Sequence, residues 1–184
     1  MFVRAKEKNL TNTAPRNIFL VGFMGTGKTS VGRALAAKLN WEFVDLDELI
    51  EKRQQRRIFD IFSVEGEAFF RELEKEALKD VSLSGMQVVS CGGGIVVDNN
   101  NIVLMKQSGV LICLSASPEV IYARTKGSLN RPLLNVPDPV ARIGELLAQR
   151  RRYYALADET VDTSAMDIAG AAEHIEKLCK MREN

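Results

Sequence analysis

The chain alternates short apolar runs with longer segments in which apolar residues recur every three or four positions. The run at 18–21 is typical of a buried strand, whereas Val31, Leu35 and Leu39 fall on one face of a helix. Applied along the whole chain, these two patterns predict strands and helices in alternation. The strands are predicted at 17–22, 41–45, 86–91, 109–114 and about 159–161, and the helices at 28–39, 47–55, 67–80, 98–108, 118–125, 139–154 and 167–180.

Strands that alternate with helices predict a parallel sheet with helices on both faces. The expected fold is therefore a three-layer α/β/α fold with five parallel strands. Two helix starts carry N-cap signals, Asp98 and Ser117, and Pro118 follows the second of them. Residues 17–184 contain no repeat or linker and predict one domain. Residues 1–16 lack the apolar core of a secretion signal and predict a flexible N-terminal tail.

Composition narrows the class of protein. The 184 residues are 46% hydrophobic and 27% charged, as in ordinary globular proteins. A formal net charge of +1 gives no general attraction to nucleic acid or membrane, and no apolar stretch is long enough to cross a bilayer. The three widely spaced cysteines favour reduced thiols. We therefore expect a cytoplasmic protein with neither nucleic acid nor membrane as a partner.

A motif with specific chemistry follows the first predicted strand. Residues 22–29 read GFMGTGKT, which matches the phosphate-loop pattern G-x-x-x-x-G-K-[ST]. Its glycines allow backbone N–H groups to face phosphate oxygens at the start of the next helix. Lys28 would reach the β- and γ-phosphates, and the Thr29 hydroxyl would bind Mg²⁺. The alternative is a glycine-rich turn with an unrelated lysine. The predicted nucleotide-binding residues are Gly25, Thr26, Gly27, Lys28, Thr29 and Ser30.

The positions of the carboxylates indicate which kind of phosphate-loop protein this is. The strand at 87–90 runs into Gly92-Gly93-Gly94 without an aspartate, and no N-K-x-D motif is present. Both absences argue against a motor ATPase and a GTPase switch. Asp45 and Asp47 instead follow another strand, at the edge where ligands bind in such sheets. One could face a metal and the other a second substrate, or Asp47 could simply cap the next helix.

Taken together, the motifs resemble those of shikimate kinases, a family in the nucleoside monophosphate kinase-like group. The resemblance covers about residues 17–180. It rests on the phosphate loop and on five further blocks in order: DLD at 45–47, IFDIFSVEGEAFFRELE at 58–74, GGG at 92–94, NRPLL at 130–134 and AQRRRYY at 148–154.

The resemblance implies an activity, in which the γ-phosphoryl of ATP is transferred to the 3-hydroxyl of shikimate. The products are ADP and shikimate 3-phosphate, on the route to chorismate and the aromatic amino acids. It further implies ATP as co-substrate, one Mg²⁺ per subunit and a monomer. Shikimate would bind in the region of about 45–75, and a mobile lid would span about 125–138. An ordinary surface loop is the alternative to the lid.

The resemblance also assigns catalytic roles. Asp47 would hydrogen-bond the shikimate hydroxyls and accept the proton of the 3-hydroxyl, while Lys28 would neutralise charge on the phosphates. Arg131 would reach the transferring phosphates from the lid and so contribute to ATP binding and catalysis. The metal would be held by Thr29 and, through water, by Asp45.

Three further residues match the shikimate-binding positions of the family. Arg71 and Arg150 would bind the substrate carboxylate, which suits the planar guanidinium group, and the Gly93 backbone would donate to the substrate. The alternative for Arg71 is a salt bridge to Glu67 or Glu74 on the same helix. A nucleic-acid patch at 150–152 is disfavoured, because three consecutive arginines on a helix point in different directions.

The sequence departs from the family pattern at two places. Gln55-Arg56-Arg57 stands where the family usually has a glycine and a small hydroxyl residue, which we expect to weaken the helix stop and cap. The loop DTSAMD at 162–167 lacks a proline that often flanks the adenine, so only Arg124 is named as an adenine-side residue.

Two other functions stay open at this point. A related kinase for a small metabolite such as gluconate would keep the phosphate loop and change the acceptor contacts. A non-enzymatic ATP-binding regulator would generally carry an added DNA-binding domain, for which 184 residues are expected to leave no room.

Overall fold

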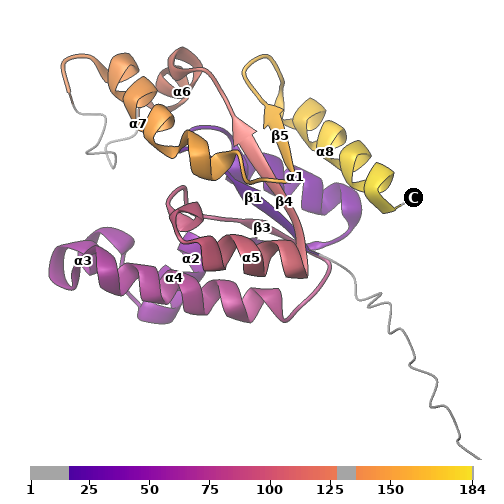
Figure 1. The fold of residues 1–184 in the computed structure, drawn as a ribbon, viewed down its shortest axis with the longest axis horizontal. Helices are drawn as coiled ribbons and strands as arrows, with labels where there is room; N and C mark the ends of the chain where they lie inside the picture. Colours follow the sequence, from indigo (N-terminus) through magenta and orange to yellow (C-terminus); the bar gives the residue numbers. More distant parts are fainter. Residues whose placement is uncertain (1–16, 128–135, 184) are drawn as a thin grey trace, which may run out of the picture.

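The computed structural model describes residues 17–127 and 136–183, and Figure 1 shows their arrangement. The predicted tail at 1–16 and the central part of the predicted lid, with Arg131, lie outside these described residues.

The sheet has five parallel strands in the order β2-β3-β1-β4-β5. This confirms the predicted sheet, with strand bounds that differ from the prediction by at most two residues. The strands are β1 (Asn17–Val21), β2 (Glu42–Asp45), β3 (Gln87–Ser90), β4 (Gly109–Ser115) and β5 (Glu159–Asp162).

Each of the seven predicted helices is present in the described residues, together with two short elements that were not predicted. The α-helices are α1 (Lys28–Leu39), α2 (Leu46–Gln54), α3 (Ile58–Val64), α4 (Gly66–Ser82), α5 (Asn99–Ser108), α6 (Pro118–Thr125), α7 (Pro139–Tyr154) and α8 (Ile168–Glu183), and η1 (Ile95–Val97) is a 3-10 helix. Both N-cap predictions are confirmed, since Asp98 accepts from Asn100 N and Ser117 accepts from Val120 N.

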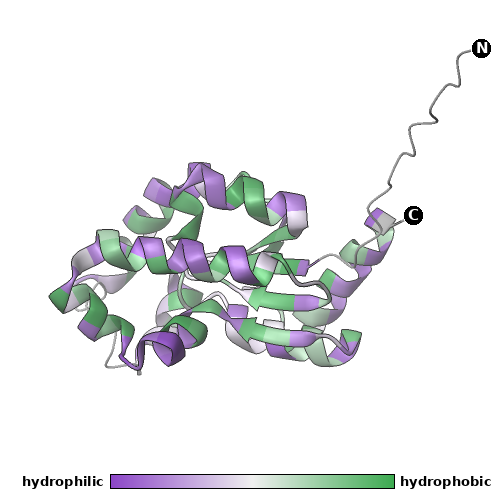
Figure 2. Ribbon diagram, turned by 90° about the horizontal axis from the view of Figure 1, so that it is seen from below, coloured by the Kyte–Doolittle hydropathy of each residue, from purple (hydrophilic) through white to green (hydrophobic). Residues whose placement is uncertain are grey.

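The central strand β1 separates two hydrophobic cores. Its alternating side chains point to opposite faces, so that Phe19 and Val21 join one core while Ile18 and Leu20 join the other. The first core is closed by α2, α3, α4, α5 and α7, and the second by α1 and α8. In Figure 2 much of the strand ribbon is green, whereas the helices alternate between green and purple along their length. Helices therefore cover both faces of the sheet, which is the predicted three-layer arrangement.

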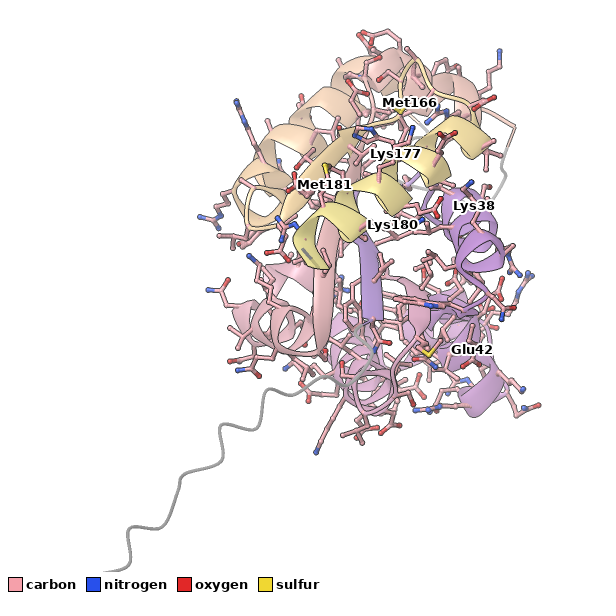
Figure 3. All side chains as sticks on the ribbon, turned by 90° about the vertical axis from the view of Figure 1, so that its right-hand side faces the viewer. Lys38, Glu42, Met166, Lys177, Lys180 and Met181 are labelled. Carbon is pink, nitrogen blue, oxygen red and sulfur yellow. The ribbon has the colours of Figure 1, made fainter. Side chains whose placement is uncertain are left out.

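The outer surface of α1 and α8 carries paired charges. Lys38 of α1 lies 3.4 Å from a Glu176 carboxylate oxygen of α8, and Lys180 lies 2.6 Å from the other oxygen of the same residue. Figure 3 looks onto this face and labels both lysines. In the described part of the chain, no helix is both long and apolar enough to cross a bilayer.

At residues 55–57, where the sequence departs from the family pattern, local hydrogen bonds make up for the missing glycine. Gln55 adopts the left-handed conformation (φ 52°), and its backbone N–H donates to Glu51 O. Its side-chain amide donates to Lys52 O at 2.6 Å. The expected weak stop of α2 is therefore not observed, because a glutamine fills the role of the glycine. Arg57 precedes α3 without a side-chain cap, as expected.

Candidate active site

A cleft of about 1000 Å³ opens at the carboxyl ends of β1, β2 and β3. The carboxyl edge of the strands is the usual place for a ligand in an open parallel sheet. Segments that are distant in sequence form the walls of the cleft. The lining residues come from the phosphate loop, from the β2–α2 junction, from α3 and α4, from the glycine triplet, and from α6, α7 and the segment before α8. They include Gly25–Val31, Asp45, Asp47, Ile58, Phe62, Phe70, Arg71, Glu74, Ser90–Gly94, Arg124, Arg150, Thr163 and Met166–Ala169.

The phosphate loop needs glycine at its start. Gly22 has φ 136°, and a Cβ there would overlap the carbonyl oxygen of Leu114 on β4. Gly27 has φ 98° and precedes the first residue of α1, so the amino end of that helix meets the cleft. All six predicted nucleotide-binding positions of the loop line the cleft. The backbone is thus shaped for an anion at a helix N-terminus.

Lys28 is folded beneath this loop. Its ammonium group donates to Gly22 O at 2.9 Å and to Phe23 O at 3.1 Å. Burial lowers the pKa of Lys28, while the nearby carboxylates of Asp47 and Asp45 oppose that shift. The ammonium group therefore lies between the loop and the carboxylates of the β2–α2 junction.

At the β2–α2 junction, the carboxylate of Asp45 accepts two hydrogen bonds. One carboxylate oxygen accepts from the Thr29 hydroxyl at 2.9 Å, and the other accepts from Asp47 N at 3.1 Å. Asp45 is therefore the N-cap of α2, and the alternative in which Asp47 caps a helix starting at Glu48 is wrong. The reason is that α2 begins at Leu46, two residues before Glu48. Asp47 is left free of capping and lines the cleft.

Thr29 and Asp45 present hard oxygen donors side by side, which fits a Mg²⁺ ion that takes its other ligands from water and phosphate. Among the described residues, no cluster of three or more His, Cys, Asp or Glu side chains could hold a metal alone. The donor set therefore fits a metal that arrives with its nucleotide.

Asp47 is a half-buried carboxyl group at the wall of the cleft. Burial is the main cause that raises its pKa, to about 6, and the charge of Asp45 adds to this shift. Lys28 and Arg71 act in the opposite direction. A carboxyl group whose pKa lies near neutrality can accept a proton from a substrate hydroxyl.

Arg71 reaches the cleft from α4 between two glutamates. It donates to Glu67 at 2.8 Å and to Glu74 at 2.7 Å, so both of the alternative salt bridges exist. The Glu74 side chain is only 1% exposed, and its second oxygen has no hydrogen-bond partner among the described residues. Burial raises the pKa of Glu74 to about 7, against the effect of Arg71. Arg71 nevertheless lines the cleft with 29% of its side chain exposed.

The glycine triplet lets these side chains approach the backbone after β3. A Cβ at Gly92 would lie 2.8 Å from Glu74 Oε1 and 3.1 Å from Asp47 Oδ1. A Cβ at Gly94 would lie 2.5 Å from a guanidinium nitrogen of Arg71. Any larger residue would displace the charged groups, so close packing explains why the turn is made of glycines.

Gly93 is bound from α7. Arg150 donates to Gly93 O at 3.4 Å, and the Tyr154 hydroxyl donates to the same oxygen at 2.9 Å. The guanidinium of Arg150 also lies 5.6 Å from the centre of the Phe23 ring. Sequence reasoning missed Tyr154. Its only signal was the spacing of four residues from Arg150, which places both on one face of α7.

The far end of the cleft contains Arg124, the residue predicted to lie on the adenine side. It donates to Thr163 Oγ1 at 2.9 Å and to Thr163 O at 2.7 Å, and Thr163 Oγ1 in turn donates to Thr26 O at 3.0 Å. Arg124 and the loop before α8 are thereby tied to the phosphate loop. Thr163 had no signal in the sequence, because its partners Arg124 and Thr26 lie 39 and 137 residues away.

Comparison with known proteins agrees with this geometry. The sequence model of the family described as shikimate kinase matches residues 24–180. A shikimate kinase of Thermodesulfovibrio yellowstonii is 47% identical over 162 residues, which cover 88% of this chain and 94% of that protein. A shikimate kinase of Caldanaerobacter subterraneus is 44% identical over 160 residues, which cover 87% of this chain and 94% of that protein.

A solved structure is also similar. Shikimate kinase from Acinetobacter baumannii in complex with shikimate superimposes with a TM-score of 0.85 and 36% identity, covering 91% of this chain and 94% of that one. The family match spans most of the chain, and the relatives match over nearly their whole length. The chain therefore belongs to the shikimate kinase family.

Proposed function

We propose that the protein is a shikimate kinase that transfers the γ-phosphoryl of ATP to the 3-hydroxyl of shikimate, giving ADP and shikimate 3-phosphate. The observation that carries this proposal is the shared cleft. Arg71 of α4 and Arg150 of α7 line the same cleft as the phosphate loop, together with the carboxyl group of Asp47. A cleft with a phosphate loop at one end and two arginines at the other suits a phosphoryl acceptor that carries a carboxylate.

On the acceptor side, Arg71 and Arg150 bind the shikimate carboxylate, and the Gly93 backbone donates to the substrate. Arginine suits this task because its planar group can form two parallel bonds to a carboxylate. Glu67 and Glu74 hold Arg71 in place from behind. Asp47 then accepts hydrogen bonds from the hydroxyl groups.

During transfer, the 3-hydroxyl oxygen forms a bond to the γ-phosphorus while the bond from that phosphorus to the β–γ bridging oxygen breaks. Asp47 takes the proton of the hydroxyl, and Lys28 neutralises charge on the β- and γ-phosphates. Thr29 and Asp45, through water, would hold one Mg²⁺ per subunit, which supplies further charge neutralisation on the phosphates. Arg131 would add a positive charge when the lid closes.

We further propose that the protein acts as a monomer in the cytoplasm. None of the three cysteines, which all lie within the described residues, forms a disulfide bond, and this fits a reducing compartment. Sedimentation of the purified protein should give the mass of one chain, and a stable dimer would contradict the monomer.

One assay tests the main proposal. Purified protein with ATP and Mg²⁺ is offered shikimate, gluconate or nucleoside monophosphates, and ADP release is coupled to NADH oxidation. Of these acceptors, we expect only shikimate to be phosphorylated. Turnover with gluconate would favour the related metabolite kinase, and ATP binding without turnover on any acceptor would favour the regulator.

A further inference from the structure

The unpredicted helix α3 forms one wall of the acceptor end of the cleft. It contributes Ile58 and Phe62, and the Phe62 ring lies 4.7 Å from the ring of Phe70 on α4. Ile61, on the same turn, is fully buried. The position of this wall therefore decides how the carbon ring of an acceptor fits beside Arg71.

This helix cannot hold its position through its own backbone. It has seven residues, which is far below the length at which an isolated helix is stable. Its N-cap residue, Arg57, makes no side-chain capping bond. Something outside α3 must supply the missing hydrogen bonds.

Three charged side chains outside the cleft do so. Glu51 of α2 accepts a hydrogen bond from the first backbone N–H of α3, on Ile58, at 2.9 Å. Arg56 makes two bonds to Glu65, at 2.6 and 2.9 Å, and thereby joins the segment before α3 to the residue that follows it. Arg56 also donates to the carbonyl oxygen of Asp60 within α3, at 3.3 Å.

We propose that Glu51 and the Arg56–Glu65 pair form a brace that positions α3, and that the brace sets the affinity for the acceptor without taking part in phosphoryl transfer. The three side chains are positioning residues, because none of them lines the cleft. The two-bond contact needs an arginine, since a lysine cannot match both carboxylate oxygens at once. The inference rests on the proposed function, because shikimate turnover is its readout.

The test is a comparison of kinetic constants. Arg56→Ala and Glu51→Gln should each raise the KM for shikimate about three- to fivefold, the range expected for one partly exposed charged contact. The KM for ATP and kcat should stay within about twofold of the wild type. Arg56→Lys should fall between the wild type and Arg56→Ala.

A matched control exists in an ion pair that joins α2 to α4. Arg53 of α2 pairs with Asp80 of α4 at 2.7 Å, and neither residue lines the cleft. Arg53→Ala should change thermal stability about as much as Arg56→Ala does while leaving the KM for shikimate unchanged. An equal rise in KM in both variants would mean that the brace has only a general structural role, and would overturn the proposal.

A charge swap covers the case in which a single variant folds poorly. Arg56→Glu and Glu65→Arg should each raise the KM for shikimate, and the double variant should recover most of the wild-type value. If the wild type phosphorylates shikimate and all of these variants keep its KM, the brace is refuted and the proposed function stands. If the wild type does not phosphorylate shikimate, it is the proposed function that fails.

Discussion

At the scale of single residues, the charged groups at the acceptor end share one feature: burial opposes their charge. Asp47 and Glu74 both have a raised pKa, and a Cβ at Gly92 would contact both carboxyl groups. Arg71 offsets part of this cost for each of them. The glycines permit the close packing, and the packing in turn adjusts the acid–base properties of the residues.

The role of Asp47 can be tested by Asp47→Asn. If Asp47 positions the hydroxyl and accepts its proton, turnover should fall about 10²- to 10⁴-fold, because an amide cannot take the proton. ATP binding, measured by titration calorimetry, should stay near the wild-type value. A variant with full turnover would leave Asp47 no role in proton transfer.

The raised pKa of Glu74 should make the stability of the fold depend on pH. Because its pKa rises from 4.5 in the unfolded chain to about 7 in the fold, the folded protein favours the protonated form. Its stabilising effect is therefore complete below pH 4.5 and is lost as the pH rises through about 7. Relative to Glu74→Gln, the wild-type free energy of unfolding should fall by up to about 3 kcal/mol across that window.

Urea unfolding of both proteins between pH 4.5 and 8 measures this difference. Arg71→Ala is a useful companion, because removing the guanidinium should raise the pKa of Glu74 further and extend the loss to higher pH. A constant difference between wild type and Glu74→Gln across the range would show that Glu74 does not titrate there.

At the scale of elements, the helices that surround the cleft differ in how they are stabilised. The helices α1, α4 and α7 are long and amphipathic, and each has a buried apolar face. The short α3 depends instead on bonds from its neighbours. The segment with Arg131 lies outside the described residues, so its role stays a prediction.

The proposed role of Arg131 can be tested by comparing phosphoryl transfer with shikimate binding. Arg131→Ala should lower turnover much more than it weakens shikimate binding without nucleotide, because Arg131 is proposed to contact the phosphates in the closed state. Stopped-flow or steady-state turnover and binary binding of shikimate measure the two effects. Normal turnover together with lost binary binding would reverse the assignment.

At the scale of the whole molecule, the fold brings together residues that have no local relationship. Arg71 and Arg150 come from different helices and lie next to consecutive glycines, Gly94 and Gly93. We propose that the two arginines line one cleft because they bind a shared anionic ligand.

A thermodynamic cycle tests that shared ligand. Arg71→Ala should weaken binding of shikimate, and the wild type should bind the methyl ester of shikimate poorly. Each loss should be on the order of 2–5 kcal/mol, since a buried charge loses its partner. The variant with the ester should lose clearly less than the sum, because both changes remove the same interaction.

The same cycle with Arg150→Ala should show the same coupling. Arg151→Ala and Arg152→Ala serve as controls, because these neighbours do not line the cleft, and they should be additive with the ester. Additive losses at Arg71 and Arg150 themselves would place the carboxylate elsewhere and remove the main local support for shikimate.

The sequence by itself determined the order of the strands and long helices along the chain and the phosphate loop, and it named the candidate site residues. These features are local, since burial periodicity, caps and the backbone demands of an anion-binding turn are all expressed within a few neighbouring positions. The same reasoning failed where the chain offered two local solutions, as at Asp45 and Asp47, because a shift of two residues in the helix start decides which carboxylate caps the helix.

Only the tertiary structure decided how the site is assembled. The bonds of Tyr154 and Thr163, the burial of Glu74 and the brace around α3 all depend on distant segments. A raised pKa follows from desolvation, which is a property of the whole surrounding fold. Sequence positions can name the groups that take part, but their charge state and partners exist only once the helices have packed against the sheet.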